Sequence, residues 1–518
     1  MRATATRTVK AAIFPVIAPG NLELANLAGL TLVYLLADGL VGAPSHDPLN
    51  VIGPLWLAVV LIWFAFNLAR LHSAGIWTAA FWLRIAVAAY FGVGSAIPYF
   101  VNEYTRSYLD AFYEASSELM FKVNIITSVG TLLMLLSIRM MTAIFPSRRS
   151  KPLLSTDEMN RARLLMGLVF GGMGFIVKDA IVLPYALGVS TVVVNAAVLQ
   201  MSQFTSVGIL LLTGWALNGR SVALAIALLL TCLDAGVGLL IFNKTDTIFP
   251  LLMFVLAVVS HRPTTLRVAA GAVVIIAIFV LIKPVVDYGR AAVYSKYNSL
   301  GGASLSERVT IVANYWELGD QTMTAAQLQR REEFQSVASR FSYMSGSAFA
   351  VSLYDGGTPG DTFGFVWTVL VPRVLSPDKT NLNILGEEFN FRATGSAASL
   401  SWPGQFAEAY WNFGWWGLPI YMIPLGVLCW FLSRYAIDVF EQGRWAYFPV
   451  VIYGVKVGVD IAAPFATVVA GSLTFVPVLH VACLILERVV HSMGRPSASA
   501  GMPSAARGAH RRFPKAGS

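Results

Sequence analysis

Single arginines in residues 287–412, here called the long segment, are the side chains of this chain best suited to chemistry. Arg340, Arg373 and Arg392 each stand without a basic neighbour, and basic and acidic residues occur in similar numbers throughout the segment. A guanidinium group makes two hydrogen bonds to a phosphate and keeps its charge when it is desolvated. The pattern therefore indicates recognition of a phosphate group. The competing interpretation is that these arginines pair with carboxylates of the segment or with lipid headgroups.

Motifs for several other common chemistries are missing from the sequence. It has no Walker motif, no GxGxxG, and no carboxylates or histidines at metal-ligand spacing. Cys232, Cys429 and Cys483 lie far apart in apolar runs, so they build neither a disulfide framework nor a CxxC metal site. We therefore expect no metal and no cofactor, and we interpret the cysteines as small buried residues.

The composition is that of a membrane protein. The 518 residues are 56% apolar and 13% charged, and their mean hydropathy is +0.65; a soluble domain carries about 25% charged residues. The net charge of +9 does not indicate nucleic-acid binding, because most basic residues lie at the ends of apolar runs, where they orient membrane proteins. The elements that position the arginines are therefore membrane-spanning helices, and we predict an all-α polytopic membrane protein.

The apolar runs predict about twelve spans of roughly 20 residues each. They lie near residues 23–42, 51–70, 76–98, 119–142, 163–185, 191–217, 221–242, 247–260, 268–286, 413–434, 445–465 and 469–488. The distribution of Lys and Arg places both termini in the cytoplasm and the long segment outside. The chain then divides into an N-terminal bundle of about nine spans (1–286), the long segment, and about three C-terminal spans (413–488). A basic, disordered cytoplasmic tail (489–518), suited to contact with anionic membrane lipid, follows them.

The long segment is expected to contain helices that lie along the membrane surface. Thr324 and Gln327 form a capping box, and apolar residues then recur at helical spacing as far as Met344, which predicts an amphipathic helix. The apolar stretch 363–371 is too short to span and is expected to be re-entrant or interfacial. Trp402 offers an aromatic face for stacking on sugar rings, although an interfacial aromatic belt explains many tryptophans of this kind.

Short motifs between residues 340 and 420 follow one another in a recognisable order. Arg340-Phe-Ser comes first, then PRVLSPDK at 372–379, then a Gly-, Phe- and Asn-bearing stretch to Arg392, and finally EAYWNFGWWG at 408–417. The order PRxxxPDK followed by ExYxNFGxxG resembles the Wzy-like polymerases of bacterial surface polysaccharides. The resemblance covers about 80 residues, and the remaining helices match in architecture alone.

The resemblance implies an inner-membrane, GT-C-like glycosyltransferase with a large periplasmic loop. Such an enzyme polymerises repeat units linked to polyprenyl (undecaprenyl) pyrophosphate into O-antigen or exopolysaccharide, and its partners include a flippase and a chain-length regulator. Polyprenyl pyrophosphate is a good leaving group, so arginines can stabilise its developing charge without a metal. On this basis Arg340, Arg373 and Arg392 are assigned to the pyrophosphate.

A base and a sugar site complete the expected active centre. An acceptor hydroxyl requires a base within hydrogen-bond reach. Glu408 is the first candidate, since partial burial at the mouth of a span would raise its pKa, and Asp378 is the second. An ion pair with an arginine of the long segment is the alternative for Glu408, and a turn with a local ion pair is the alternative for Asp378. Trp402, Tyr410 and Asn412 are the candidate sugar-binding residues.

Two other functions stay open. O-antigen ligases share this architecture, and the resemblance implies that they use a histidine in the large outer loop; the long segment has none. A flippase or transporter of lipid-linked sugars would use charges inside the membrane as an ion relay. Such charges occur at Arg84, Lys178, Asp179, Asp234, Lys456 and Asp460. Lys456 and Asp460 are four residues apart and are expected to pair on one helix face.

Overall fold

The protein is described by a computed structural model. The described residues are 17–40, 47–72, 74–100, 116–146, 156–190, 198, 201–261, 263–297, 302–318, 341–371, 375–376, 383–395 and 402–494. Within these ranges the chain forms helices and no strand. Eleven of the helices are long and apolar enough to cross a membrane. The expectation of an all-α, multi-pass membrane protein is therefore confirmed.

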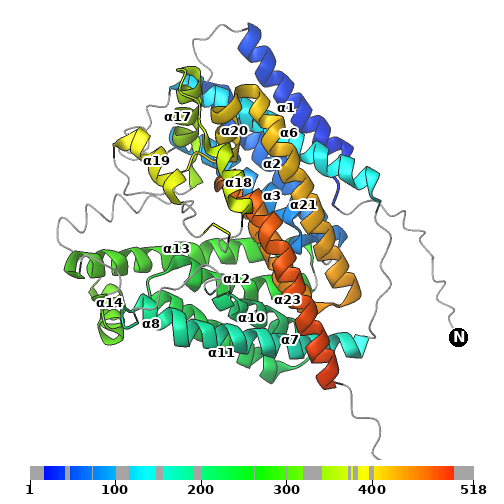
Figure 1. Ribbon diagram of the computed structural model, residues 1–518, viewed down its shortest axis with the longest axis vertical. Coiled ribbons are helices and arrows are strands. Elements are labelled where there is room, and N and C mark those ends of the chain that lie inside the picture. Colours follow the sequence, from blue (N-terminus) through cyan, green and yellow to red (C-terminus); the bar gives the residue numbers. More distant parts are fainter. Residues whose placement is uncertain are drawn as a thin grey trace, which may run out of the picture.

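Helices from both ends of the chain form a first group, which is drawn in blue, cyan, orange and red (Figure 1). Within it α21 packs against α6, and α22 packs against α3. Its members are α1 (Asn21–Leu40), α2 (Asp47–Leu71), α3 (Ala79–Val87), α6 (Ser117–Ile144), α20 (Gln405–Phe413), α21 (Gly417–Gln442), α22 (Phe448–Val459) and α23 (Gly471–Gly494). The π-helical segment η2 (Ala88–Val93) and the short α4 (Gly94–Ala96) extend α3.

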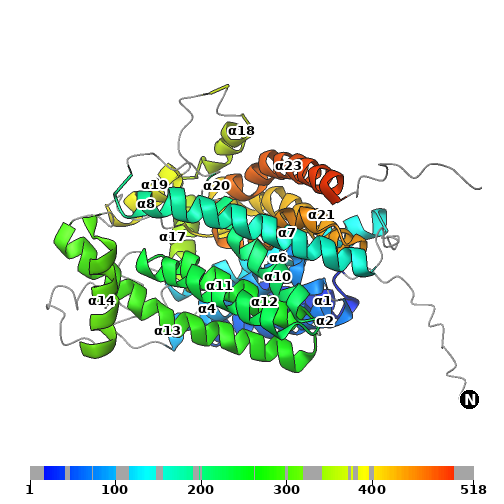
Figure 2. The ribbon, with the colours of Figure 1, turned by 90° about the horizontal axis from the view of Figure 1, so that it is seen from below.

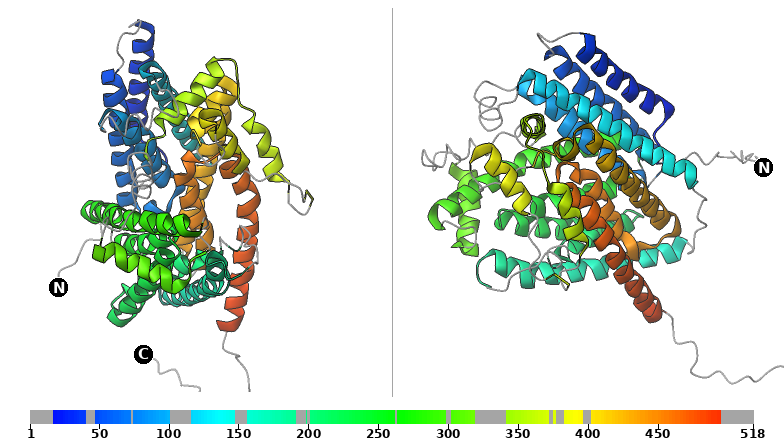
Figure 3. Two further views of the ribbon diagram at one scale, coloured as in Figure 1. Left: turned by 90° about the vertical axis from the view of Figure 1, so that its left-hand side faces the viewer. Right: turned by 45° about the horizontal axis from the view of Figure 1, so that its top comes forward.

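A second group is built from the middle of the chain and lies beside the first (Figure 2). Its members are α7 (Thr156–Val177), α8 (Leu183–Ala186), α10 (Phe204–Ala216), α11 (Ser221–Leu240), α12 (Lys244–His261), α13 (Thr265–Tyr297) and α14 (Leu305–Leu318). The π-helical segment η4 (Lys178–Val182) joins α7 to α8. Both views of Figure 3 show these green and teal helices gathered apart from the blue and orange ones.

A tryptophan joins the two groups. The guanidinium carbon of Arg163 on α7 lies 4.6 Å from the centre of the Trp445 ring. The indole N–H of Trp445 also donates a 3.1 Å hydrogen bond to the backbone carbonyl of Met159. A cation over an aromatic face and a satisfied indole N–H both stabilise this contact. The turn between α21 and α22 is therefore anchored to the start of α7.

Most predicted spans coincide with a helix, and two differ in length. The run 191–217 was expected to be one span, but the described helix within it, α10, has 13 residues and is about 20 Å long. Eleven of the twelve expected spans therefore coincide with a long apolar helix, and the twelfth contains only the shorter α10. The span predicted at 268–286 lies within the longer α13, which continues to Tyr297, beyond the expected start of the long segment.

Between α14 and α20, the described part of the long segment contains three short α-helices. They are α17 (Met344–Asp355), α18 (Phe365–Leu370) and α19 (Asn383–Thr394). With six residues α18 is too short to cross a membrane, and its Val369 packs against Ala466 and Ala470. The amphipathic helix expected from Thr324 onward lies outside the described residues, except at its end.

Candidate functional site

Helix α20 positions most of the predicted site. Two glycines with positive φ bracket it, Gly404 (φ 83°) and Gly414 (φ 57°), a backbone conformation that other residues rarely adopt. All residues from Gln405 to Asn412 are buried. A nine-residue helix that is buried on every side must satisfy its polar side chains within the protein. The partners of those side chains therefore define the site.

The Glu408 carboxylate accepts three hydrogen bonds and has no exposed surface. Thr362 Oγ1 donates to Oε1 at 2.9 Å, and the Trp402 indole N–H donates to Oε2 at 3.1 Å. The backbone N–H of Phe465 donates to Oε2 at 2.8 Å. None of these donors is an arginine. Glu408 thus fastens two parts of the long segment to the C-terminal helices, and in this conformation its carboxylate is closed off from solvent.

The Asn412 side chain continues this network. Its amide N–H groups donate to Thr362 Oγ1 at 2.8 Å and to the backbone carbonyl of Glu408 at 2.9 Å. Its carbonyl oxygen accepts a 3.2 Å hydrogen bond from the backbone N–H of Phe363. Since the side chain is 6% exposed, Asn412 in this conformation holds residues 362–363 in place and does not face open space.

Tyr410, Asp355 and Lys122 form a polar cluster that was not predicted from the sequence. The Tyr410 hydroxyl donates a 3.0 Å hydrogen bond to Asp355, whose other carboxylate oxygen pairs with Lys122 at 2.6 Å. The Lys122 ammonium also lies 4.9 Å from the centre of the Tyr410 ring. Lys122 and Asp355 are about one-third exposed, so this cluster is open to a ligand. They are 233 residues apart, and nothing in the sequence links them.

Arg392 lies on an exposed edge next to α20. Its guanidinium pairs with Glu388 at 2.7 Å, one turn earlier on α19, and its guanidinium carbon is 5.7 Å from the centre of the Trp411 ring. On the same helix Phe389 is buried between Trp402 and Trp411, with ring centres 6.1 Å and 5.5 Å away. Trp402 therefore packs as a core residue here, whereas Arg392 remains open to an anionic ligand.

Five of the eight predicted site residues can be placed in this way. Glu408, Trp402, Tyr410, Asn412 and Arg392 all lie on or against α20. The other three, Arg340, Arg373 and Asp378, lie outside the described residues. The described residues contain no group of three or more His, Cys, Asp or Glu side chains arranged to hold a metal ion.

Three of the six charged residues in predicted spans take part in two buried ion pairs. Arg84 on α3 makes a two-pronged contact with Glu23 on α1, at 2.7 Å and 3.1 Å, and both side chains are at most 3% exposed. Lys178 pairs with Asp234 on α11 at 2.5 Å. Both pairs join different helices, as the structural interpretation of these charges requires.

The expected pair of Lys456 and Asp460 is not formed in the described structure. The reason is local: α22 ends at Val459, and Asp460 begins the 3₁₀ segment η10 (Asp460–Ala462). The change of helical pitch alters the angle between the two side chains. The Lys456 side chain is exposed and Asp460 is half-buried.

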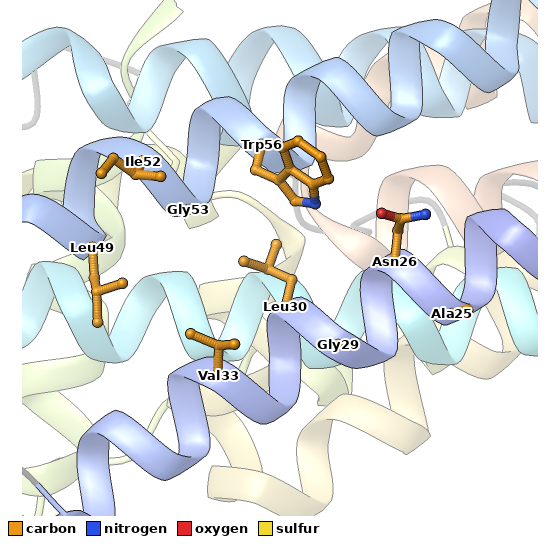
Figure 4. Close-up of a pocket in the computed structure, with 9 residues that line it drawn as sticks. All are labelled: Ala25, Asn26, Gly29, Leu30, Val33, Leu49, Ile52, Gly53 and Trp56. Carbon is orange, nitrogen blue, oxygen red and sulfur yellow. The ribbon is translucent and has the colours of Figure 1, made fainter.

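A groove of about 510 Å³ lies between α1 and α2, away from these residues (Figure 4). Gly29, where an added Cβ would meet no other atom, leaves space in it, and Leu30 and Trp56 supply apolar walls. Its one polar side chain, Asn26, already donates a 2.8 Å hydrogen bond to the carbonyl of Leu22. None of the predicted site residues lines the groove, and it carries no charged group.

Neither a protein-family model, nor a curated protein, nor a solved structure matches the chain. The functional assignment therefore rests on the residues and the geometry described above.

Proposed function

We propose that the protein is a membrane glycosyltransferase that polymerises polyprenyl-pyrophosphate-linked repeat units into a bacterial surface polysaccharide. The observation that carries this proposal concerns the motif at residues 408–417. Its Glu408, Tyr410 and Asn412 each hold a part of the long segment against the spanning helices, with Arg392 exposed beside them. An arginine at the edge of such a rigid platform suits a pyrophosphate group.

The proposed reaction needs a nucleophile, a leaving group and a proton acceptor. A sugar hydroxyl of one lipid-linked unit attacks the anomeric carbon of the growing chain. The bond from that carbon to the pyrophosphate oxygen breaks, and its electron pair leaves with polyprenyl pyrophosphate. Arg340, Arg373 and Arg392 stabilise this negative charge, and a carboxylate takes the hydroxyl proton. Asp378 of the PRxxxPDK motif and Glu408 of the ExYxNFGxxG motif are the candidate carboxylates.

The proposed location is the bacterial inner membrane, with the long segment on the periplasmic side and both termini in the cytoplasm. The sequence predicts twelve spans, an even number of crossings, and eleven of them coincide with a long apolar helix. The basic residues at the ends of the spans support this orientation. In that topology α20, α19 and the Lys122–Asp355 cluster all lie at the periplasmic ends of the spans, where lipid-linked repeat units are exposed after translocation.

A second candidate function is the movement of lipid-linked sugars across the membrane. The buried Lys178–Asp234 pair favours it, because Lys178 begins a π-helical segment and such segments are frequent at functional sites. An ion-coupled carrier would use this pair as a proton relay.

The experiment that separates these functions is the size distribution of surface glycan in a deletion strain that expresses the wild-type chain. A polymerase restores long chains, and its loss leaves single repeat units attached at the cell surface. A ligase defect leaves chains of normal length on the carrier lipid. A flippase defect traps repeat units on the cytoplasmic face, and this result would contradict our proposal.

A further inference from the structure

Two irregular helical segments contact the start of α20, and a third begins next to Phe465, whose backbone N–H donates to Glu408. They are the π-helical η2 (Ala88–Val93), the 3₁₀ segment η10, and the π-helical η11 (Ala466–Ala470). Gly404 lies against the Phe91 ring, and the Gln405 side chain donates a 3.0 Å hydrogen bond to the carbonyl of Asp460. Inside a membrane, irregular backbone is tolerated where it is buried in protein or lines a water-filled cavity. Such segments are frequent at functional sites, and three of them lie near the start of α20.

Polar groups at this place lack the partners that a purely structural role would give them. The Gln405 side chain is completely buried, yet its Oε1 has no hydrogen-bond partner among the described residues. The Asp460 carboxylate is half-buried and forms no ion pair there. The side chains of Tyr90 and Tyr453 lie within electrostatic range of this carboxylate. An unsatisfied amide oxygen and an unpaired carboxylate are both acceptors, and they suit a ligand rich in hydroxyl donors.

The exposure of Lys456 within a span argues for a hydrated space at this place. Lys456 lies in the span Trp445–Ala462. This span is among the most buried of the described part of the chain, since 72% of its residues are buried inside the protein. Lys456 is nevertheless exposed, one turn before Asp460. A charged lysine within a span faces the protein interior or an aqueous cavity, because contact with lipid tails is too costly. Its exposed surface therefore belongs to a hydrated space that it shares with Asp460.

We propose that Tyr90, Tyr453, Lys456 and Asp460 line a hydrated chamber that binds the acceptor sugar, with the buried Gln405 amide behind its wall, and that Asp460 is its catalytic base. This inference rests on the proposed polymerase function. The Asp460 carboxylate takes the proton of the attacking hydroxyl, the oxygen bonds to the anomeric carbon, and the electron pair of the broken bond leaves with the pyrophosphate. Asp460 suits this step better than Glu408 does, because Asp460 is half-buried, whereas the Glu408 carboxylate is completely buried and holds three donors of the protein itself.

The chamber is tested without any activity measurement, by reaction of single cysteines with methanethiosulfonate ethylsulfonate in lipid nanodiscs. The background carries Cys232→Ser, since Cys429 and Cys483 are buried. We expect Lys456→Cys to react quickly. The matched control is Val478→Cys on α23, which is 67% exposed on an apolar surface and should not react. If Lys456→Cys is as unreactive as Val478→Cys, the chamber does not exist.

The role of Asp460 is tested by the polymerisation rate of the full-length protein with a lipid-linked repeat unit. We expect Asp460→Asn to slow polymerisation by at least about 100-fold, as for loss of a general base, and Asp460→Glu to restore part of the rate. The control Asp438→Asn removes a carboxylate at the other end of the bundle, 3.5 Å from Arg434, and should keep the wild-type rate.

The outcomes separate this inference from the function on which it rests. An Asp460→Asn protein that is correctly folded and polymerises at the wild-type rate would overturn the role of Asp460 and leave the polymerase proposal intact. A wild-type protein that fails to polymerise would overturn both the polymerase proposal and that role. The cysteine labelling result decides on the chamber in either case.

Discussion

The backbone N–H of Phe465 donates a 2.8 Å hydrogen bond to the carboxylate of Glu408, 57 residues earlier in the chain. The same carboxylate accepts hydrogen bonds from Thr362 and Trp402. One buried side chain therefore connects the long segment, α20 and the start of the last spanning helix. This arrangement gives Glu408 a structural role that is independent of any part in catalysis.

Replacing Glu408 should destabilise the protein. Glu408→Ala leaves three buried donors without an acceptor, and each unsatisfied group costs about 1–3 kcal/mol. Glu408→Gln keeps one carbonyl oxygen and should lose less. Thermal unfolding in lipid nanodiscs provides the measurement, with the exposed Glu388→Gln as the control. Equal unfolding midpoints for Glu408→Ala and the control would show that the carboxylate does not hold these elements together.

Arg392 should matter for activity and hardly at all for stability. It is 37% exposed and pairs with Glu388 on the surface, an arrangement that contributes about 0–1 kcal/mol. If the guanidinium binds pyrophosphate, Arg392→Ala should sharply reduce the polymerisation rate, and Arg392→Lys should recover only part of it, because an ammonium group cannot make the two-pronged contact. The control Glu388→Gln removes the partner and leaves the arginine. An Arg392→Ala protein with the wild-type rate would remove this residue from the site.

The Glu23–Arg84 pair should show strong coupling between its two members. Glu23→Gln leaves a buried guanidinium without its counter-charge, which destabilises a protein by about 3–5 kcal/mol. The double variant Glu23→Leu/Arg84→Met removes both charges and should regain much of that loss. A double-mutant cycle on thermal stability measures the coupling. Additive effects of the single substitutions would mean that the two charges do not depend on each other.

The Lys178–Asp234 pair discriminates between polymerase and carrier. In our proposal it joins α7 and α11, so the apolar double variant Lys178→Met/Asp234→Leu should keep the wild-type polymerisation rate. The single variants should be less stable than the double variant, because each leaves one charge unpaired. Repeat units that accumulate on the cytoplasmic face in the double variant would instead identify the pair as an ion relay.

Gly414 should tolerate no side chain. Its φ of 57° places it in the left-handed region, and an added Cβ would lie 2.7 Å from the Tyr354 hydroxyl. We expect Gly414→Ala to destabilise the turn between α20 and α21 by about 1–3 kcal/mol. Gly364→Ala is the matched control, since Gly364 has a φ of −56° and open space around its Cα. Similar unfolding midpoints for the two variants would contradict this expectation.

The spans could be predicted from the sequence because a bilayer imposes one length and one composition on every crossing helix. The expected run at 119–142, for example, lies within α6. One failed prediction, the Lys456–Asp460 pair, has a local cause. The Lys456–Asp460 pair fails because α22 gives way to a 3₁₀ turn between the two residues, and periodicity does not reveal such a change of pitch.

The contacts of the site could not be predicted in the same way. Glu408 and Tyr410 stand out in the sequence, but their partners Thr362, Phe465 and Asp355 are 46 to 57 residues away. Lys122 lies still further from Asp355. A hydrogen bond between distant residues leaves no periodic trace in a single sequence, because it depends on how the helices pack. The residues of α20 were therefore identified, whereas the reason for their burial was not.

The division of the first helix group between the two ends of the chain has a consequence for biosynthesis. The backbone N–H of Ala80 on α3 donates a 2.8 Å hydrogen bond to the Ser433 hydroxyl on α21, and α6 packs against α21. About 260 residues separate the end of α6 from the start of α20. A ribosome needs roughly 13 to 52 s to synthesise them. During that interval the inserted N-terminal helices wait in the bilayer with these contact surfaces uncovered, so any chaperone that assists insertion is needed most at this stage of translation.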